Sequence, residues 1–431
     1  ADVWSVSEGA GAEAEAASLD PSLEALSLIG SNNWAVAGTR TASGRAIMAN
    51  DMHLGHGMPN IWYRAWLRWK VDGNDRTMSG VTLPGVPAIV AGSNGRIAWG
   101  FTNSQGDWTD LIELEFEEGS ETRYRTPDGY AELATFEEVV RVKGGGEETV
   151  VVEETIWGPV IDTDHRGVRR AVRWIAHDPE GVSLSLTRLA EASTLEQAID
   201  AAHRAGIPTQ NFVVAADDGR IGWTLAGPVP DRFGHDGRFP VSWANGNHGW
   251  DGHLSGDRLP RLIDPPSGVI WTANNRTMDG RDLAVMGDGG YATGARARQI
   301  RDGLFAIDAA TPEDMLTLQL DDRALFLERW HDLLLEVLGN ETPPGLEELK
   351  KHVETTWTGH ASDDSVAYRM VRGWRGEVMQ RVFDPLTEPC RQVDPDFNYR
   401  GRYEGPLWRL LEERPPHLLD PKYADWDELL V

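Results

Sequence analysis

Apolar and polar residues alternate along much of the first three hundred positions, which is the pattern of half-buried β-strands. In residues 61–71 the apolar side chains stand at every second position and would share one face of a strand. Two further pairs of apolar runs, at residues 89–100 and 212–224, flank short polar turns. The first turn contains Asn94-Gly95, and Asn-Gly between apolar runs is a strong signal for a hairpin. The pattern therefore predicts sheets with antiparallel ladders.

The apolar spacing changes to three and four positions in the last third of the chain, which is typical of helices that bury one face. Residues 324–338 and 364–383 show this spacing, and Thr311-Pro312 has the residue types that open a helix. An isolated helix is predicted earlier, over residues 193–206. Strands combined with late helices indicate the α+β class.

By pattern, the chain divides into three segments. Residues 1–30 are low in complexity, with a run of Glu, Ala and Gly, and we expect them to be poorly ordered. Residues 31–304 are predicted to be rich in strands, and residues 305–431 to be mainly helical. No internal repeat accounts for the length of the chain.

Composition narrows the possible partners. The chain has 431 residues and a net charge of −27, so the basic surface of a nucleic-acid-binding protein is not expected. No run of about 18 apolar residues occurs, which argues against a membrane helix and a membrane partner. Because Cys390 is the single cysteine, neither an intramolecular disulfide nor thiol catalysis is expected. Most of the eighteen tryptophans are expected in the core or in a pocket wall.

Candidate chemistry centres on Gly30-Ser31, just before a predicted strand. Gly-Ser-Asn-Asn is ordinary turn sequence, and a plain loop is the first alternative. If the chain is cut between Gly30 and Ser31, however, Ser31 gains a free α-amine beside its hydroxyl. A hydroxyl needs a base to become a nucleophile, and an α-amine with a pKa of about 7.7–8 can serve. Gly30 has no side chain to obstruct an attack by Ser31 on its carbonyl, which suits self-cleavage.

Two motifs carry a family resemblance. Gly-Ser-Asn-Asn-Trp-x-Val-x-Gly at residues 30–38, followed by Ala-Asn-Asp-x-His-Leu at 49–54, resembles the start of the β-subunit in the penicillin acylase family of N-terminal nucleophile hydrolases. That family includes acyl-homoserine lactone and cephalosporin acylases. The resemblance implies an αββα sandwich, incomplete in this fragment. It also implies autocatalytic activation of a zymogen, with residues 1–30 as a linker or propeptide and 31–431 as a portion of the β-subunit.

The same resemblance implies a longer precursor and a particular compartment. The chain starts at Ala1 and stops at Val431 inside an apolar helical pattern, so we expect it to be a fragment of that precursor. An α-subunit from the same precursor would then be its partner in a heterodimer. Family members imply a periplasmic or extracellular location, although these residues contain no signal-peptide pattern.

Acyl transfer requires a nucleophile, a base and donors aimed at the oxyanion. Ser31 would supply the first two. The resemblance assigns the oxyanion donors to the backbone N–H of Asn103 and the side-chain amide of Asn274. It also places His53 near the new amine and Arg296 where it orients Asn274. The open alternatives are a turn at Asn274, a structural histidine at position 53 and a solvated helix-face charge at Arg296.

A calcium site is the second implication of the resemblance. Aspartates 107 and 110 follow the first oxyanion segment, and oxygen-only ligands suit Ca²⁺. The alternative is a pair of solvated aspartates. The full expected ligand set comprises the side chains of Asp107, Asp110 and Asp288 and the carbonyl oxygens of Thr109 and Gly237.

The predicted activity is hydrolysis of a linear amide between an acyl group and an amine, through an acyl-enzyme. The acyl pocket is expected to include aromatic residues from positions 59–63 and residues near Leu83 and Pro84. Phenylacetyl, aliphatic, glutaryl and fatty acyl groups all stay open, although His53 tilts the choice away from phenylacetyl. Antibiotic metabolism is one implied setting. Trp157 stands where family members often have His, and no role follows from the change.

Two other classes of function compete with the acylase. One is a non-catalytic secreted binding module that uses exposed tryptophans, for example on carbohydrate. The other is a hydrolase with an internal serine, for which the sequence is weak. Its best match to the Gly-x-Ser-x-Gly elbow is at Ser93, where Ala91 replaces the leading glycine.

Overall fold

The computed structural model describes residues 30–55, 57–340, 342–395, 397 and 403–431, and the low-complexity segment 1–29 lies outside them. The described chain forms two compact units. The sandwich unit comprises residues 28–297 and 304–315, and the helical unit comprises 298–303 and 316–431.

The sandwich unit is built on two antiparallel sheets. The small sheet has the order β19-β1-β2, in which the central strand carries Ser31. Its strands are β1 (Gly30–Val36), β2 (Ile47–His53) and β19 (Val269–Thr272). The large sheet has the order β18-β15-β14-β6-β5-β4-β3. Its strands are β3 (Tyr63–Val71), β4 (Asn74–Thr82), β5 (Ala91–Ser93), β6 (Ile97–Asn103), β14 (Gln210–Ala216), β15 (Ile221–Ala226) and β18 (Arg261–Ile263).

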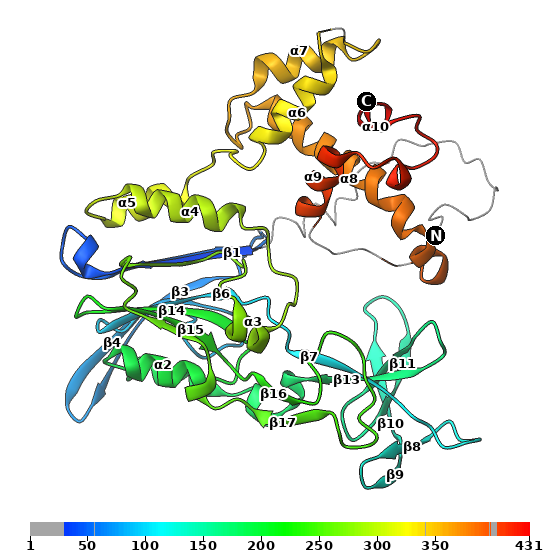
Figure 1. The fold of residues 1–431 in the computed structure, drawn as a ribbon. Coiled ribbons are helices and arrows are strands. Elements are labelled where there is room, and N and C mark those ends of the chain that lie inside the picture. Colours follow the sequence, from blue (N-terminus) through cyan, green and yellow to red (C-terminus); the bar gives the residue numbers. More distant parts are fainter. Residues whose placement is uncertain (1–29, 56, 341, 396, 398–402) are drawn as a thin grey trace. The chain divides into compact units, whose positions relative to one another are not determined.

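The two sheets pack face to face between helices (Figure 1). Ala35 and Ile270 of the small sheet share a buried cluster with Val213, Ala215 and Trp223 of the large sheet. On the other face of the large sheet lies α2 (Leu195–His203), whose Leu195, Ala198 and Ile199 pack with strand residues in a second core. The predicted αββα sandwich is therefore confirmed, because a helical layer also covers the outer face of the small sheet.

That outer layer comes from α4 (Ala295–Ala306) and α5 (Pro312–Gln319). The ring of Phe305 lies 6.2 Å from that of Trp271, and Trp34 Nε1 lies 3.1 Å from the sulfur of Met315. Helix α5 begins at Pro312 as predicted, and α2 begins with Thr194 capping the N–H of Gln197. The short helices η1 (Gly38–Arg40), η4 (Leu184–Ala190), η5 (Gly256–Arg258) and α3 (Gly280–Met286) complete this part of the unit.

Both predicted hairpins form, but one predicted face is not buried. Strands β5 and β6 are joined through Gly95, and β14 and β15 through Gly219, both at positive φ. Strand β3 also forms, yet Tyr63 and Leu67 are exposed within this unit and only Ala65 and Trp69 are half-buried. The reason is its place at the edge of the sheet, where one strand neighbour and few covering side chains are available.

Smaller sheets extend from the sandwich. A cluster of Ile112, Leu114, Ala171 and Trp243 forms their core, and Trp157 packs against it. Trp157 is therefore a structural aromatic residue here. The strands are β7 (Thr109–Glu113), β8 (Arg123–Thr126), β9 (Gly129–Glu132), β10 (Ala134–Arg141), β11 (Glu147–Glu154), β12 (Val160–Thr163), β13 (Arg169–Trp174), β16 (Pro230–Phe233) and β17 (Gly249–His253), with short helices η2 (Ile175–His177) and η3 (Pro179–Gly181).

The helical unit has its own core around Trp330, Leu334 and Val371. Buried Glu404 accepts hydrogen bonds from Trp330 and Arg375, which compensates its charge. The helices are α6 (Glu328–Leu338), α7 (Glu347–Thr356), α8 (Val366–Val393), α9 (Glu404–Glu413), η6 (Pro416–Leu418) and α10 (Trp426–Leu430). Helix α6 starts four residues later than the predicted 324–338, and α8 continues past the predicted end at residue 383.

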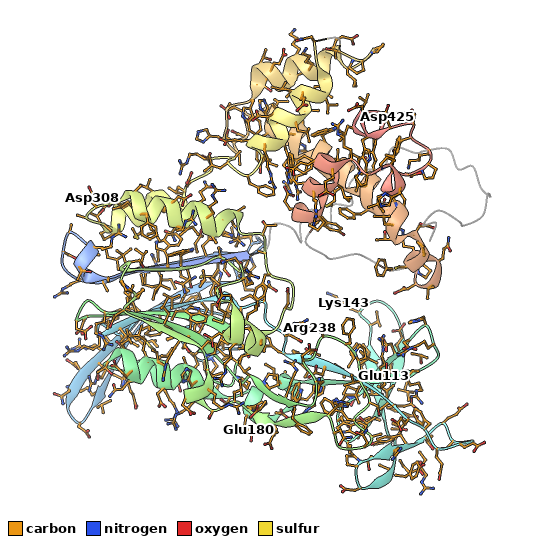
Figure 2. All side chains as sticks on the ribbon, in the orientation of Figure 1. Glu113, Lys143, Glu180, Arg238, Asp308 and Asp425 are labelled. Atoms are coloured by element: carbon orange, nitrogen blue, oxygen red, sulfur yellow. The ribbon has the colours of Figure 1, made fainter. Side chains whose placement is uncertain are left out.

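Charged side chains such as Lys143, Glu180 and Arg238 lie on the surface (Figure 2). Among the described residues, no helix has both the length and the apolar content needed to cross a membrane.

Candidate active site

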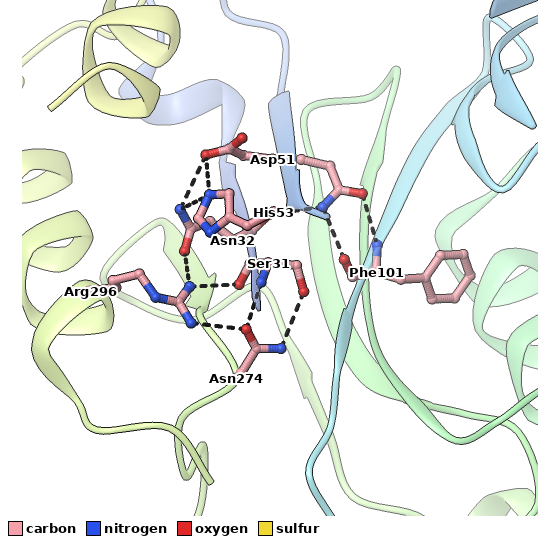
Figure 3. Close-up of polar contacts among 8 residues, drawn as sticks. Ser31, Asn32, Asp51, His53, Phe101, Asn274 and Arg296 are labelled. Atoms are coloured by element: carbon pink, nitrogen blue, oxygen red, sulfur yellow. Dashed lines mark hydrogen bonds and ion pairs between the residues drawn. The ribbon is translucent and has the colours of Figure 1, made fainter. Parts of the chain in front are cut away.

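Ser31 lies in the central strand of the small sheet and is bound at both ends by Asn274. The backbone N–H of Ser31 donates to Oδ1 of Asn274 at 2.7 Å, and Nδ2 of Asn274 donates to the Ser31 hydroxyl at 3.2 Å (Figure 3). Asn274 follows β19, which pairs with β1, and it adopts a left-handed backbone (φ 60°) that asparagine tolerates better than most residues. Both side chains are buried.

Arg296, near the start of α4, fixes the orientation of this asparagine. Its Nη2 donates to Oδ1 of Asn274 at 3.0 Å, and its Nη1 donates to the carbonyl oxygen of Ser31 at 3.0 Å. The amide oxygen of Asn274 is thereby held toward the guanidinium, and its N–H groups face the serine hydroxyl. Burial lowers the pKa of Arg296, and the charge of Asp51 opposes that shift.

His53 reaches this centre through two neighbouring residues. Its Nε2 lies 2.9 Å from Oδ2 of Asp51 and 3.3 Å from Nδ2 of Asn32. Asn32 in turn accepts a hydrogen bond from Arg296. Burial opposes ionisation of Asp51, but hydrogen bonds from His53 and Asn32 outweigh it and lower the pKa of Asp51. His53 thus contacts the network that holds Arg296, rather than acting at the expected place beside the serine amine.

Asn103, at the end of β6, completes the group. Nδ2 of Asn274 donates to the backbone carbonyl of Asn103 at 3.1 Å, and Asn103 lines the same cavity as Ser31 and Asn274. Four of the five predicted catalytic residues therefore meet around one serine, and His53 lies one hydrogen-bonded step away. The positions come from four distant parts of the chain.

The cavity at Ser31 has a volume of about 400 Å³, and among the described residues its lining contains no charged side chain. Two of the predicted wall residues, Trp62 and Leu83, line it, whereas Tyr63 lines a neighbouring cavity. Sequence reasoning missed several apolar wall residues because nothing local marks them. These are Met52, Leu54, Val86, Val90, Phe101, Leu186 and Ile207.

The expected calcium ligands gather around Asp107. Arg232 lies 2.7 Å from a carboxylate oxygen of Asp110 and 3.4 Å from one of Asp107. Burial, assisted by the charge of Asp110, outweighs Arg232 and raises the pKa of Asp107 to about 6. The pair therefore carries more negative charge than the single arginine compensates, which suits a further cation.

Backbone oxygens would have to complete such a site. Thr109 N lies 3.4 Å from Asp107 Oδ1, and a Cβ atom at Gly237 would lie 2.9 Å from Asp107 Oδ2. A Cβ atom at Gly287, next to Asp288, would lie 2.5 Å from the Cβ atom of Asp107. Within the described ranges, no group of three or more His, Cys, Asp or Glu side chains is arranged to hold a metal. The donors present fit calcium only with the carbonyls of Thr109 and Gly237.

Comparison with known proteins adds independent information. The sequence model of the penicillin amidase family matches residues 3–429. The penicillin acylase 2 proenzyme of Pseudomonas sp. strain SE83 is 31% identical over 442 residues, covering 97% of this chain and 55% of that protein. The acyl-homoserine lactone acylase QuiP of Pseudomonas aeruginosa is 28% identical over 412 residues, covering 90% and 47%. The chain thus spans about half the length of the curated relatives it matches.

The fold also matches a solved structure. A thermostable penicillin G acylase from Alcaligenes faecalis superposes with a TM-score of 0.70 at 21% identity, covering 91% of this chain and 74% of that one. At that identity the match supports the sandwich architecture, and the chemistry has to be argued from the residues.

Proposed function

The chain belongs to the penicillin amidase family, and from that premise we propose that it carries the amide-hydrolysing centre of an acylase. The observation that carries the proposal is the pair of hydrogen bonds between Ser31 and Asn274 at the end of an apolar cavity. Scission after Gly30 would convert the bonded N–H of Ser31 into an α-amine. The same residue would then hold nucleophile and base.

The proposed reaction uses Ser31 twice. Its Oγ attacks the amide carbonyl while its amine accepts the hydroxyl proton. The negative oxygen of the tetrahedral intermediate is stabilised by Nδ2 of Asn274 and the backbone N–H of Asn103. Collapse releases the amine product with a proton and leaves an acyl-serine. Water, deprotonated by the same amine, then hydrolyses the ester and frees the acid.

Arg296 would support this reaction in two ways. It holds Oδ1 of Asn274, so that the amide N–H groups stay aimed at the reacting centre. Its positive charge near Ser31 also disfavours a second positive charge on the new amine, which favours the neutral form that acts as a base.

The cavity walls indicate the class of substrate. An apolar lining without charged side chains suits an uncharged, apolar acyl group and disfavours a dicarboxylate such as glutaryl. We therefore propose a linear amide of an apolar acid as substrate. An α-subunit cut from the same precursor, and a periplasmic or extracellular location, belong to the same proposal.

Calcium is proposed as a structural ion at Asp107. Asp107 and Asp110 would supply carboxylate oxygens, and Thr109 and Gly237 carbonyl oxygens, with Asp288 beside them. The support is the uncompensated charge that raises the pKa of Asp107. A bound Ca²⁺ would hold this carboxylate ionised at neutral pH and tie β7 to the loops around it.

The test of the proposed function is Ser31→Ala in the full-length protein, with mass spectrometry of the product and an amide-hydrolysis assay. We expect neither cleavage after Gly30 nor turnover. Ser93→Ala is the matched control, because Ser93 is the alternative internal serine and only bonds the carbonyl of Ile97. Normal cleavage and turnover in Ser31→Ala would refute the proposal. A wild-type protein that stays intact and inactive would favour a non-catalytic binding module instead.

A further inference from the structure

Asn50, in β2, joins the two sheets directly beside the candidate active site. Its Nδ2 donates to the carbonyl of Asn32 at 2.8 Å and to that of Phe101 at 2.9 Å, and its Oδ1 accepts from the N–H of Phe101 at 3.2 Å. One side-chain amide therefore links β1, one residue after Ser31, to β6, two residues before Asn103.

The large sheet leaves a place for this side chain. Strand β5 is paired with Ala98 and Trp99 of β6, and its recorded pairing stops before Phe101. The amide of Asn50 makes the two bonds to Phe101, one accepted and one donated, that a strand partner would make. A Cβ atom at Gly100 would lie 2.8 Å from Oδ1 of Asn50, so glycine there is what allows the close approach.

We propose that Asn50 is a positioning residue that sets the separation between Ser31 and the oxyanion donor on β6. This inference rests on the proposed acylase function. The nucleophile belongs to one sheet and the backbone donor at Asn103 to the other, so their relative placement depends on what connects the sheets at this point. A misplacement of about 1 Å can cost on the order of 100-fold in rate. Asn50 acts through the backbone of both strands.

Three variants of the full-length protein test this role. Asn50→Asp keeps the size and the acceptor but loses both donors, and Asn50→Ala removes the amide. Gly100→Ala keeps Asn50 and displaces its side chain. For each variant we would measure kcat per titratable serine, KM for one amide substrate, and the midpoint of thermal unfolding. We expect kcat to fall about 10–100-fold with KM within about threefold of the wild type.

Asn94→Ala is the matched control. Asn94 also satisfies several backbone groups, donating to the carbonyls of Leu189 and Ala192 and accepting from two N–H groups, but it lies in the β5–β6 turn. It lines none of the cavity at Ser31. We expect its loss to lower the unfolding midpoint while leaving kcat per serine unchanged.

The outcomes separate this inference from the function on which it rests. Unchanged kcat in both Asn50 variants would overturn it, and so would an equal fall of kcat in Asn94→Ala, which would show a general effect of stability. If Asn50→Ala does not fold, the isosteric Asn50→Asp decides. Failure of the acylase function would appear elsewhere, as a wild-type protein without turnover or as normal cleavage in Ser31→Ala.

Discussion

The carboxamide of Asn274 contacts Ser31 at both of its polar ends. Its oxygen accepts the backbone N–H at 2.7 Å, and its nitrogen donates to the hydroxyl at 3.2 Å. The N–H is the group that cleavage would convert into an amine, and the hydroxyl is the proposed nucleophile. One amide therefore orients both halves of the proposed catalytic residue.

The first prediction concerns this amide. Asn274→Ala removes a proposed oxyanion donor, and such a loss typically costs about 2.7–4 kcal/mol of transition-state stabilisation, or about 100–1,000-fold in kcat. Steady-state kinetics on the cleaved enzyme would measure it. Asn275→Ala is the control, because Asn275 bonds only the neighbouring backbone at Ala273 and Arg276 in the contacts described. Equal activity in the two variants would exclude Asn274 as a donor.

Arg296→Gln tests the guanidinium. Without it, the orientation of Asn274 is no longer fixed and the amine of Ser31 loses a nearby positive charge. Because that charge favours the neutral amine, its removal should move the acidic limb of the kcat/KM profile to higher pH. We also expect a fall in kcat of about tenfold or more. Arg298→Gln, whose side chain is 77% exposed, should change neither quantity. An unshifted pH profile in Arg296→Gln would contradict the electrostatic role.

Gly30 is predicted to control cleavage without affecting turnover. A Cβ atom there would lie 2.8 Å from Nη2 of Arg296 and 3.2 Å from Oδ1 of Asn274, so a side chain would push both groups away. Gly30→Val should therefore slow cleavage by about tenfold or more, as followed by gel electrophoresis over time. Once cut, the variant should show wild-type kcat, because residue 30 no longer belongs to the chain that carries Ser31.

The control for this variant is Gly55→Ala, where a Cβ atom would meet no atom within 4 Å. Its cleavage should proceed at the wild-type rate. Cleavage of Gly30→Val at the wild-type rate would show that the glycine is not required for the close approach.

Local pattern predicted what local physics determines. The hairpin turns at Gly95 and Gly219 and the helix start at Pro312 follow from residue types with fixed backbone preferences, and all three form. The motif at Ser31 pointed to the site because its residues are consecutive. The bridge made by Asn50 joins strands that are far apart in sequence, so no local signal announces it. For the same reason the exposure of Tyr63 depends on the edge position of β3, which is a property of the whole sheet.

The last prediction separates calcium binding from a merely acidic pair. Burial raises the pKa of Asp107 from 3.8 to about 6, so between these values the folded state keeps a proton that the unfolded state releases. Without metal, stability should therefore fall as pH rises through that window, by about 1–2 kcal/mol in total. Asp107→Asn should abolish this fall. Added Ca²⁺ should reverse it in the wild type by binding the ionised carboxylate, and should leave the variant unchanged. Thermal unfolding between pH 4 and pH 7 (about two units around the shifted pKa), with and without Ca²⁺, measures all four cases. The absence of any calcium effect on the full-length wild type would refute the proposed ion.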